Sequence, residues 1–139
     1  MRVPLEQAGY RELEHTADWE LEVWGPDITA LLEQAAQGMY SLMGLELAER
    51  PRQRRRLVIE AEDREGLIVE FLGELLFLQE SEGLAFDSID LADHWGAVHA
   101  DLEGASIRGQ TKEIKAVTFH RLEVRDTPRG LETRIVFDV

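Results

Sequence analysis

The sequence predicts an α+β fold, a single domain in which mostly antiparallel, mixed sheets pack against two main helices. Two stretches repeat apolar residues at helical spacing, and the strand-like stretches are grouped in runs instead of alternating strictly with helices. The chain has 139 residues, and a chain of that size buries roughly two thirds of its unfolded surface. Residues 1–139 are therefore expected to form one domain.

The first third of the chain is predicted to contain two strands and a helix. Residues 10–14 and 19–24 are the strands, and the second alternates apolar with mostly acidic side chains. A polar kink at residues 14–18 lies between them. Asp27 is placed to cap the helix, because its carboxylate can accept a hydrogen bond from the first turn, and Gly44 is placed to end it.

The rest of the chain is predicted to form one more helix among further strands. Asp63 is placed to cap this helix and Gly83 to end it. The predicted strands are residues 54–61, 84–93, 97–103, 114–126 and 131–138, with the last two joined as a hairpin through the Pro-Arg-Gly turn at residues 128–130. Residues 104–110, with a glycine near each end, are predicted to form a mobile loop.

The charge of the chain restricts its partners. A formal net charge of -13 argues against direct binding of nucleic acid by the protein as a whole, because binding to phosphates requires a basic surface. One basic run, residues 50–56, has two readings. It is a solvated loop that supplies countercharge to acidic surroundings, or it contacts RNA phosphates or an acidic patch on a partner; charge runs generally favour the first.

Composition also bears on the compartment. Cysteine is absent, which excludes disulfides, thiolate zinc sites and thiol nucleophiles and fits a reducing compartment. The N-terminus lacks the apolar core of a signal peptide, and no stretch reaches the roughly 18 apolar residues of a membrane span. A cytoplasmic protein without membrane contact is therefore expected.

The last residues are candidate metal ligands. Residues 134–139 have a strand pattern, Asp138 is penultimate, and Val139 adds its terminal carboxylate. A strand that continues to the last residue is expected to be tied into a sheet, which would hold both anionic groups in place. Asp18, in the polar kink, is a third candidate. Such oxygen ligands suit calcium, magnesium or manganese, with calcium preferred for its tolerant geometry; the alternative is that these acids are unrelated surface residues.

Three segments carry a resemblance to a known family. They are His15-Thr16-Ala17-Asp18 followed by the strand at 19–24, residues 111–120, and the terminal Phe137-Asp138-Val139. In this order and at these distances from both ends, they resemble the archease family, whose members assist tRNA-splicing ligases of the RtcB type. Phe119 stands where tyrosine is common in that family, and Val139 where isoleucine is common.

The resemblance implies a site and an architecture. It implies that Asp18, Asp138 and Val139 form the metal site and that Lys115 is an exposed residue that touches the ligase. The alternative for Lys115 is a lysine at a strand edge that resists aggregation. The resemblance also implies a core unit of strand, helix, strand and strand. His15 would orient the Asp18 segment. The other histidines, His94, His99 and His120, have no zinc-site spacing and are expected to be ordinary hydrogen-bonding side chains.

The leading functional hypothesis is an accessory factor, not an enzyme. The resemblance implies a metal-binding protein that activates an RtcB-type ligase by promoting its guanylylation and repeated turnover. No serine elbow, phosphate-binding glycine loop or dinucleotide fingerprint occurs in the sequence. Two alternatives remain: a metal-dependent phosphoester hydrolase in which Asp18, Glu20 and Glu22 activate water, and a chaperone-like binding module for nucleic-acid enzymes.

Overall fold

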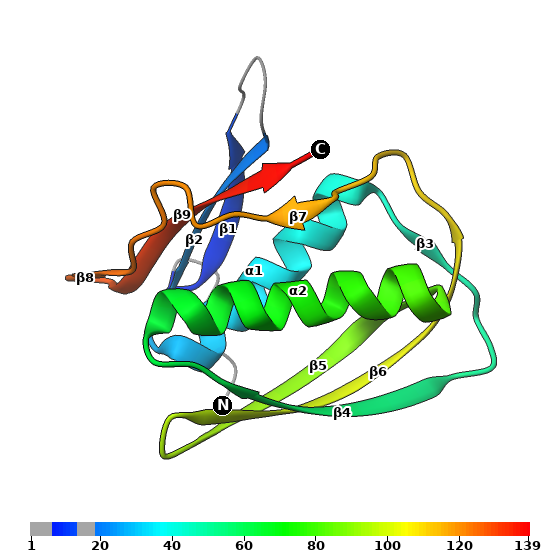
Figure 1. Cartoon of the computed structure of the whole chain (residues 1–139), viewed down its shortest axis with the longest axis horizontal. Coiled ribbons are helices and arrows are strands. Elements are labelled where there is room, and N and C mark those ends of the chain that lie inside the picture. Colours follow the sequence, from blue (N-terminus) through cyan, green and yellow to red (C-terminus); the bar gives the residue numbers. More distant parts are fainter. Residues whose placement is uncertain (1–6, 14–18) are drawn as a thin grey trace.

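The computed structural model describes residues 7–13 and 19–139, which form an α+β arrangement of two antiparallel sheets and two helices (Figure 1). One sheet has the strand order β1-β2-β9-β7, with β8 also paired to β9; the other has the order β3-β6-β4, with β5 also paired to β6. In chain order the elements are β1 Gly9–Leu13, β2 Trp19–Gly25, α1 Ile28–Met43, β3 Glu46–Leu47, β4 Gln53–Glu60, α2 Arg64–Glu82, β5 Leu84–His94, β6 Ala97–Gly109, β7 Ala116–Val117, β8 Arg125–Thr127 and β9 Gly130–Asp138.

The helices begin and end where the sequence predicts. Asp27 caps α1 by accepting a hydrogen bond from the Ala30 amide at 2.9 Å, and Asp63 caps α2 in the same way. Gly44 and Gly83 end the helices with φ angles of 59° and 66°, a left-handed conformation that a side chain disfavours. Both pairs of predictions are confirmed.

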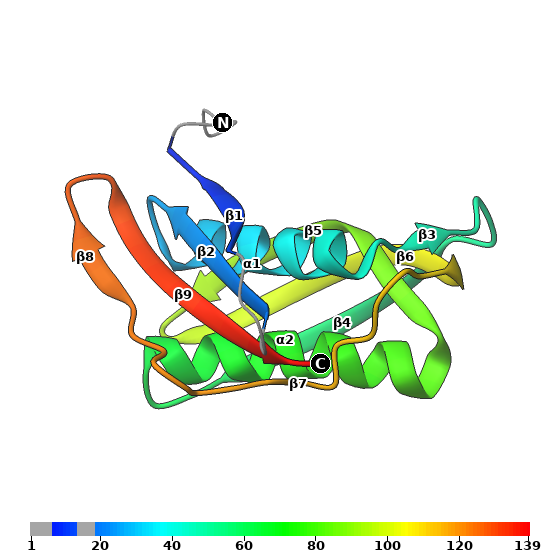
Figure 2. The same cartoon turned by 90° about the horizontal axis from the view of Figure 1, so that it is seen from above.

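Both helices lie between the two sheets, as Figures 1 and 2 show. Helix α1 packs against β1 and β2 of one sheet and against β5 of the other, while α2 contacts β4, β5 and β7. Apolar residues of all these layers form one continuous cluster, so the helices are covered on two sides. Its largest fully buried side chains include Phe71, Phe86, Phe137, Leu21, Leu31 and Leu32.

The predicted mobile loop at residues 104–110 is wrong. Strand β6 continues through Gly109 and, past residue 104, pairs first with β5 and then with β3. Gly104 is needed there because a Cβ atom would lie 1.8 Å from the Ala85 carbonyl oxygen, next to the register shift between Phe86 and Ser88. The glycine marks a close approach of two backbones, not a flexible segment.

The predicted strand at residues 114–126 is also wrong. Only the two ends of this segment pair with β9. Strand β7 pairs with the end of β9, and β8 pairs with the start of β9. Between them Arg121 has a φ of 55° and the Leu122 amide donates to the Phe119 carbonyl, which makes a turn. Ile114 and Val124 are both buried, so the segment is held by side chains at its two ends and leaves the sheet between them. The predicted hairpin of β8 and β9 is confirmed.

Candidate functional site

The candidate site lies at the end of β9, which is held on both sides. Trp19 of β2 pairs with Phe137, and Ala116 of β7 pairs with Asp138. The Lys115 amide donates a hydrogen bond of 2.8 Å to the Asp138 carbonyl. Phe137 is fully buried, whereas Asp138 and Val139 are exposed. The prediction that the last strand is tied into a sheet is therefore confirmed, and exposed Asp138 and Val139 lie at the end of a backbone that these hydrogen bonds hold in place.

Residues 111–120 run beside this strand end and are anchored to the end of α1. The amides of Thr111 and Lys112 donate to the Met43 carbonyl at 2.9 and 3.2 Å, which satisfies an acceptor at the C-terminal end of the helix. Farther along, the amide and the hydroxyl of Thr118 both donate to the Val136 carbonyl. The segment that carries the resemblance is thus fixed to α1 at one end and to β9 at the other.

Two lysines belong to this segment. The Lys112 ammonium lies 3.4 Å from the centroid of the Trp19 ring, a cation–π contact that ties the segment to β2. Lys115 is exposed and lines an open pocket together with Gln79, Gln110 and Glu113. Lys115 directly precedes β7. Its predicted exposure is confirmed.

The structure describes two of the three predicted metal ligands. Asp138 and Val139 lie together at the strand end, but His15 and Asp18 fall outside the described residues. Asp18 precedes Trp19 in the sequence, and Trp19 pairs with the residue before Asp138. Within residues 7–13 and 19–139, no group of three or more histidine, aspartate or glutamate side chains could hold a metal. The placement of a metal therefore remains a prediction.

The acids of β2 are engaged by arginines. Arg11 donates a hydrogen bond of 2.7 Å to Glu22, which holds the pKa of that carboxyl below its ordinary value, and Arg129 reaches the same carboxylate at 3.4 Å. Arg134 lies 4.0 Å from Glu20. A carboxylate held by two guanidinium groups is a weak base, so this arrangement argues against Glu22 as the water-activating group of a hydrolase.

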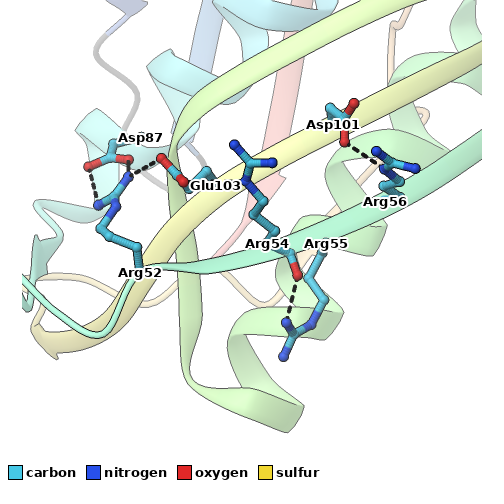
Figure 3. Close-up of polar contacts among 7 residues, drawn as sticks. All are labelled: Arg52, Arg54, Arg55, Arg56, Asp87, Asp101 and Glu103. Carbon is cyan, nitrogen blue, oxygen red and sulfur yellow. Dashed lines mark hydrogen bonds and ion pairs between the residues drawn. The ribbon is translucent and has the colours of Figure 1, made fainter.

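Residues 53–56 of the basic run belong to β4 and residues 50–52 precede it, so the predicted loop is wrong for the larger part of the run. Arg52 donates two hydrogen bonds to Asp87, Arg54 lies 3.4 Å from Glu103, and Arg56 lies 3.0 Å from Asp101 (Figure 3). On the other face of the strand, Arg55 pairs with Glu82 at 2.7 Å. The four acids in these contacts, Asp87, Asp101, Glu103 and Glu82, come from β5, β6 and α2.

These pairs decide between the two readings of the basic run. The hydrogen bonds from Arg52 and Arg55 lower the pKa values of Asp87 and Glu82, so both acids are ionised at neutral pH and compensate the arginine charges. An RNA phosphate would have to compete with these carboxylates. The structure favours countercharge within the chain over a phosphate-binding strip.

Sequence reasoning missed the closeness of two histidines. His94 of β5 and His99 of β6 were treated as scattered, but their rings meet edge to face with centroids 4.8 Å apart. The sequence spacing could have revealed this contact, because a two-residue turn at residues 95 and 96 places His94 and His99 on neighbouring strands. The Lys112–Trp19 contact was also missed, since nothing in the sequence relates these two positions.

No helix in the described part of the chain is long and apolar enough to cross a membrane.

Comparisons with known proteins place the chain among its relatives. Residues 10–139 match the model of the archease protein family. The archease of Methanothermobacter thermautotrophicus is 30% identical over 138 residues, covering 94% of this chain and 99% of the relative. The archease of Thermococcus kodakarensis is 29% identical and covers 87% and 91%. A crystal structure from Thermotoga maritima, described as an archease and possible chaperone, superposes with a TM-score of 0.71 at 26% identity, covering 100% of this chain and 98% of that one. The chain belongs to the archease family.

Proposed function

We propose that this chain is a metal-binding accessory protein that activates an RtcB-type tRNA-splicing ligase by promoting its guanylylation and repeated turnover. One observation carries the proposal: the end of β9 presents exposed Asp138 and Val139 on a backbone held on both sides by β2 and β7. Asp18 directly precedes the β2 residue that pairs next to Asp138. An accessory role also agrees with membership of a family in which one solved relative is described as a possible chaperone.

Asp138, the terminal carboxylate of Val139 and Asp18 would hold the metal. All three are hard oxygen donors, which favours calcium, with manganese or magnesium as alternatives. The residues present fit such an ion, because Asp138 is exposed and its backbone is fixed by the Lys115 amide at 2.8 Å. A bound cation supplies positive charge that can orient phosphate oxygens of the guanylylation reaction. His15 would orient the Asp18 segment, and exposed Lys115 would contact the ligase beside the metal.

Calcium or manganese should raise the thermal stability of the protein, and Asp138→Asn should remove most of that rise. Without the cation, Asp138 and its anionic neighbours repel one another. A free ion at about 100 times its Kd stabilises the folded state by about 2.7 kcal/mol, which raises the Tm of a chain of this length by on the order of 10 °C. Calorimetry with and without the ion measures the shift.

The matched control is Asp90→Asn, which removes the same charge from an exposed position on the other sheet. It should keep the full metal-induced shift. If saturating metal leaves the Tm of the wild-type protein unchanged, the proposed metal site is wrong.

Extending the chain beyond Val139 should weaken metal binding far more than extending it before Met1. A peptide bond at Val139 converts its carboxylate into an amide, which removes one anionic ligand and adds atoms beside Asp138. Each tagged form is titrated with manganese, and the enhancement of water-proton relaxation reports the bound ion. The two titrations give the two affinities. Equal affinity of the two forms would show that the terminal carboxylate is not a ligand.

A metal-dependent hydrolase remains the competing function. Incubation of the protein alone with GTP and with simple phosphoesters, in calcium and in manganese, separates the two. The accessory proposal expects no turnover without the ligase, whereas hydrolysis by the isolated protein favours the hydrolase.

A further inference from the structure

Trp95 lies at the tip of the hairpin that joins β5 to β6, and its exposed fraction is 103%. A tryptophan side chain carries more apolar surface than almost any other, and in this position all of it faces water. Folding therefore gains nothing from its burial. Asparagine or glycine would serve the turn at least as well.

The backbone makes tryptophan a poor choice for this turn. His94 pairs with Ala97, so Trp95 and Gly96 form a two-residue loop, and their φ angles are 58° and 88°. Positive φ at both central residues defines a type I′ turn, which favours asparagine, aspartate or glycine at the first position. A bulky residue with positive φ is a steric outlier. Asp93 accepts a hydrogen bond from the Gly96 amide at 3.2 Å and so helps to hold the turn.

Neither core packing nor turn preference thus accounts for Trp95, which leaves contact with a partner. Tryptophan is the residue most enriched among those that dominate binding energy at protein interfaces, where it fills a pocket on the partner. A two-residue turn holds its backbone in place, so little conformational freedom is lost on binding.

The charges around the tip indicate the chemistry of the partner. Glu60 and Asp93 are exposed on the strands that end there, and neither forms an ion pair with another residue in the described ranges. The nearest arginine along β4, Arg56, is paired with Asp101. An acidic rim repels nucleic-acid phosphates and complements basic side chains. The tip therefore fits an apolar pocket with a basic rim on a protein.

The tip is remote from the end of β9. In Figure 1 the turn between β5 and β6 lies at the lower left, below the helices, whereas the C-terminus lies above them. Strands β5 and β6 belong to one sheet and β9 to the other. Two separated contacts would fix the orientation of the metal-bearing edge on a partner, which one contact alone cannot do.

We propose that the Trp95 hairpin is a second docking point, inserting the indole into a basic-rimmed apolar pocket of the ligase. This inference rests on the proposed function, because it commits to the same partner. Glu60 contributes electrostatic attraction at the rim, so the association rate falls as salt rises.

The test is the affinity of Trp95→Asn for the cognate ligase, measured by calorimetric titration of the full chains. Asparagine tolerates positive φ, so the variant should fold with an unchanged or higher Tm while its Kd rises by about tenfold or more. Phe77→Ala is the matched control: it removes an aromatic side chain, 60% exposed, from α2, and its Kd should not change. Glu60→Gln should lower the association rate without lowering the Tm.

A second readout follows the indole itself. In protein labelled with 5-fluorotryptophan, the fluorine resonance of Trp95 is assigned as the one that is missing in Trp95→Asn. When the ligase is added to the wild-type protein, this resonance should no longer shift between H2O and D2O, because the indole is shielded from solvent. The resonance of Trp24 should change less.

The failures of the two proposals are distinguishable. If the wild-type protein binds and stimulates the ligase and Trp95→Asn binds equally well, the docking point is wrong and the proposed function stands. If the wild-type protein neither binds nor stimulates the ligase, both are overturned. If Trp95→Asn weakens only binding to RNA, or only self-association in sedimentation, the assignment to the ligase is overturned.

Discussion

Gly104→Ala should destabilise the fold by about 3 kcal/mol or more. The added Cβ would lie 1.8 Å from the Ala85 carbonyl oxygen and 2.7 Å from the Phe86 Cα, and both are backbone atoms of buried residues that cannot rotate away. Relief requires β5 and β6 to separate beside the register shift, in the sheet that supports both helices. Urea denaturation measures the loss.

Gly73→Ala is the control for this substitution. A Cβ at this position in α2 meets no atom within 4 Å, and alanine is the better helix former, so a gain of about 0.5–1 kcal/mol is expected. A Gly104→Ala protein as stable as the wild type would mean that the pairing of β5 with β6 is not as described.

Asp138→Ala and Asp18→Ala should each reduce the stimulation of ligase turnover on the order of 10- to 100-fold. Each removes one of the proposed metal ligands, so the cation is lost or displaced. The Asp138 variant should remain folded, because the strand is held there through the backbone carbonyl and by buried Phe137. Lys115→Ala should instead weaken association, an effect that increases at low salt, and leave the rate at saturation nearly unchanged.

The measurement is the number of ligation cycles per ligase molecule, with circular dichroism of each variant to confirm folding. Asp90→Ala, which removes an exposed carboxylate from the other sheet, should stimulate like the wild type. If the Asp138 variant is folded and still fully active, the cation cannot be the source of activation.

Local signals predicted the helices and the terminal strand correctly. A cap such as Asp27 and a stop such as Gly44 act within one helical turn, so their neighbours in sequence are enough to identify them. The strand at the C-terminus was likewise readable from its strand pattern; Ile135, Val136 and Phe137 are buried, and Arg134 and Asp138 are exposed.

Non-local contacts produced the errors. Gly104 looks like part of a flexible loop in sequence, yet its lack of a side chain is required by the approach of the Ala85 carbonyl, a contact that no local pattern reveals. Ile114 and Val124 look like positions of one strand, but they are two separate anchors to the core on either side of a turn.

The candidate site also combines residues that a local pattern predicts with contacts that depend on the fold. Asp138 and Val139 follow from the pattern of the last strand, whereas the Lys112–Trp19 contact depends on the path of residues 111–120 from α1 to β9. Trp95 was not singled out, because an aromatic residue near a strand is usually part of the core. Its positive φ and full exposure are properties of the folded turn.

The most direct test of the central claim is the rate of guanylate formation on the cognate RtcB-type ligase under multiple-turnover conditions, with GTP, metal and RNA ends, in the presence and absence of this protein. The account predicts that the ligase alone completes few cycles and that the wild-type protein restores rapid guanylylation between cycles. A wild-type protein that leaves this rate unchanged with its own ligase would contradict the accessory function.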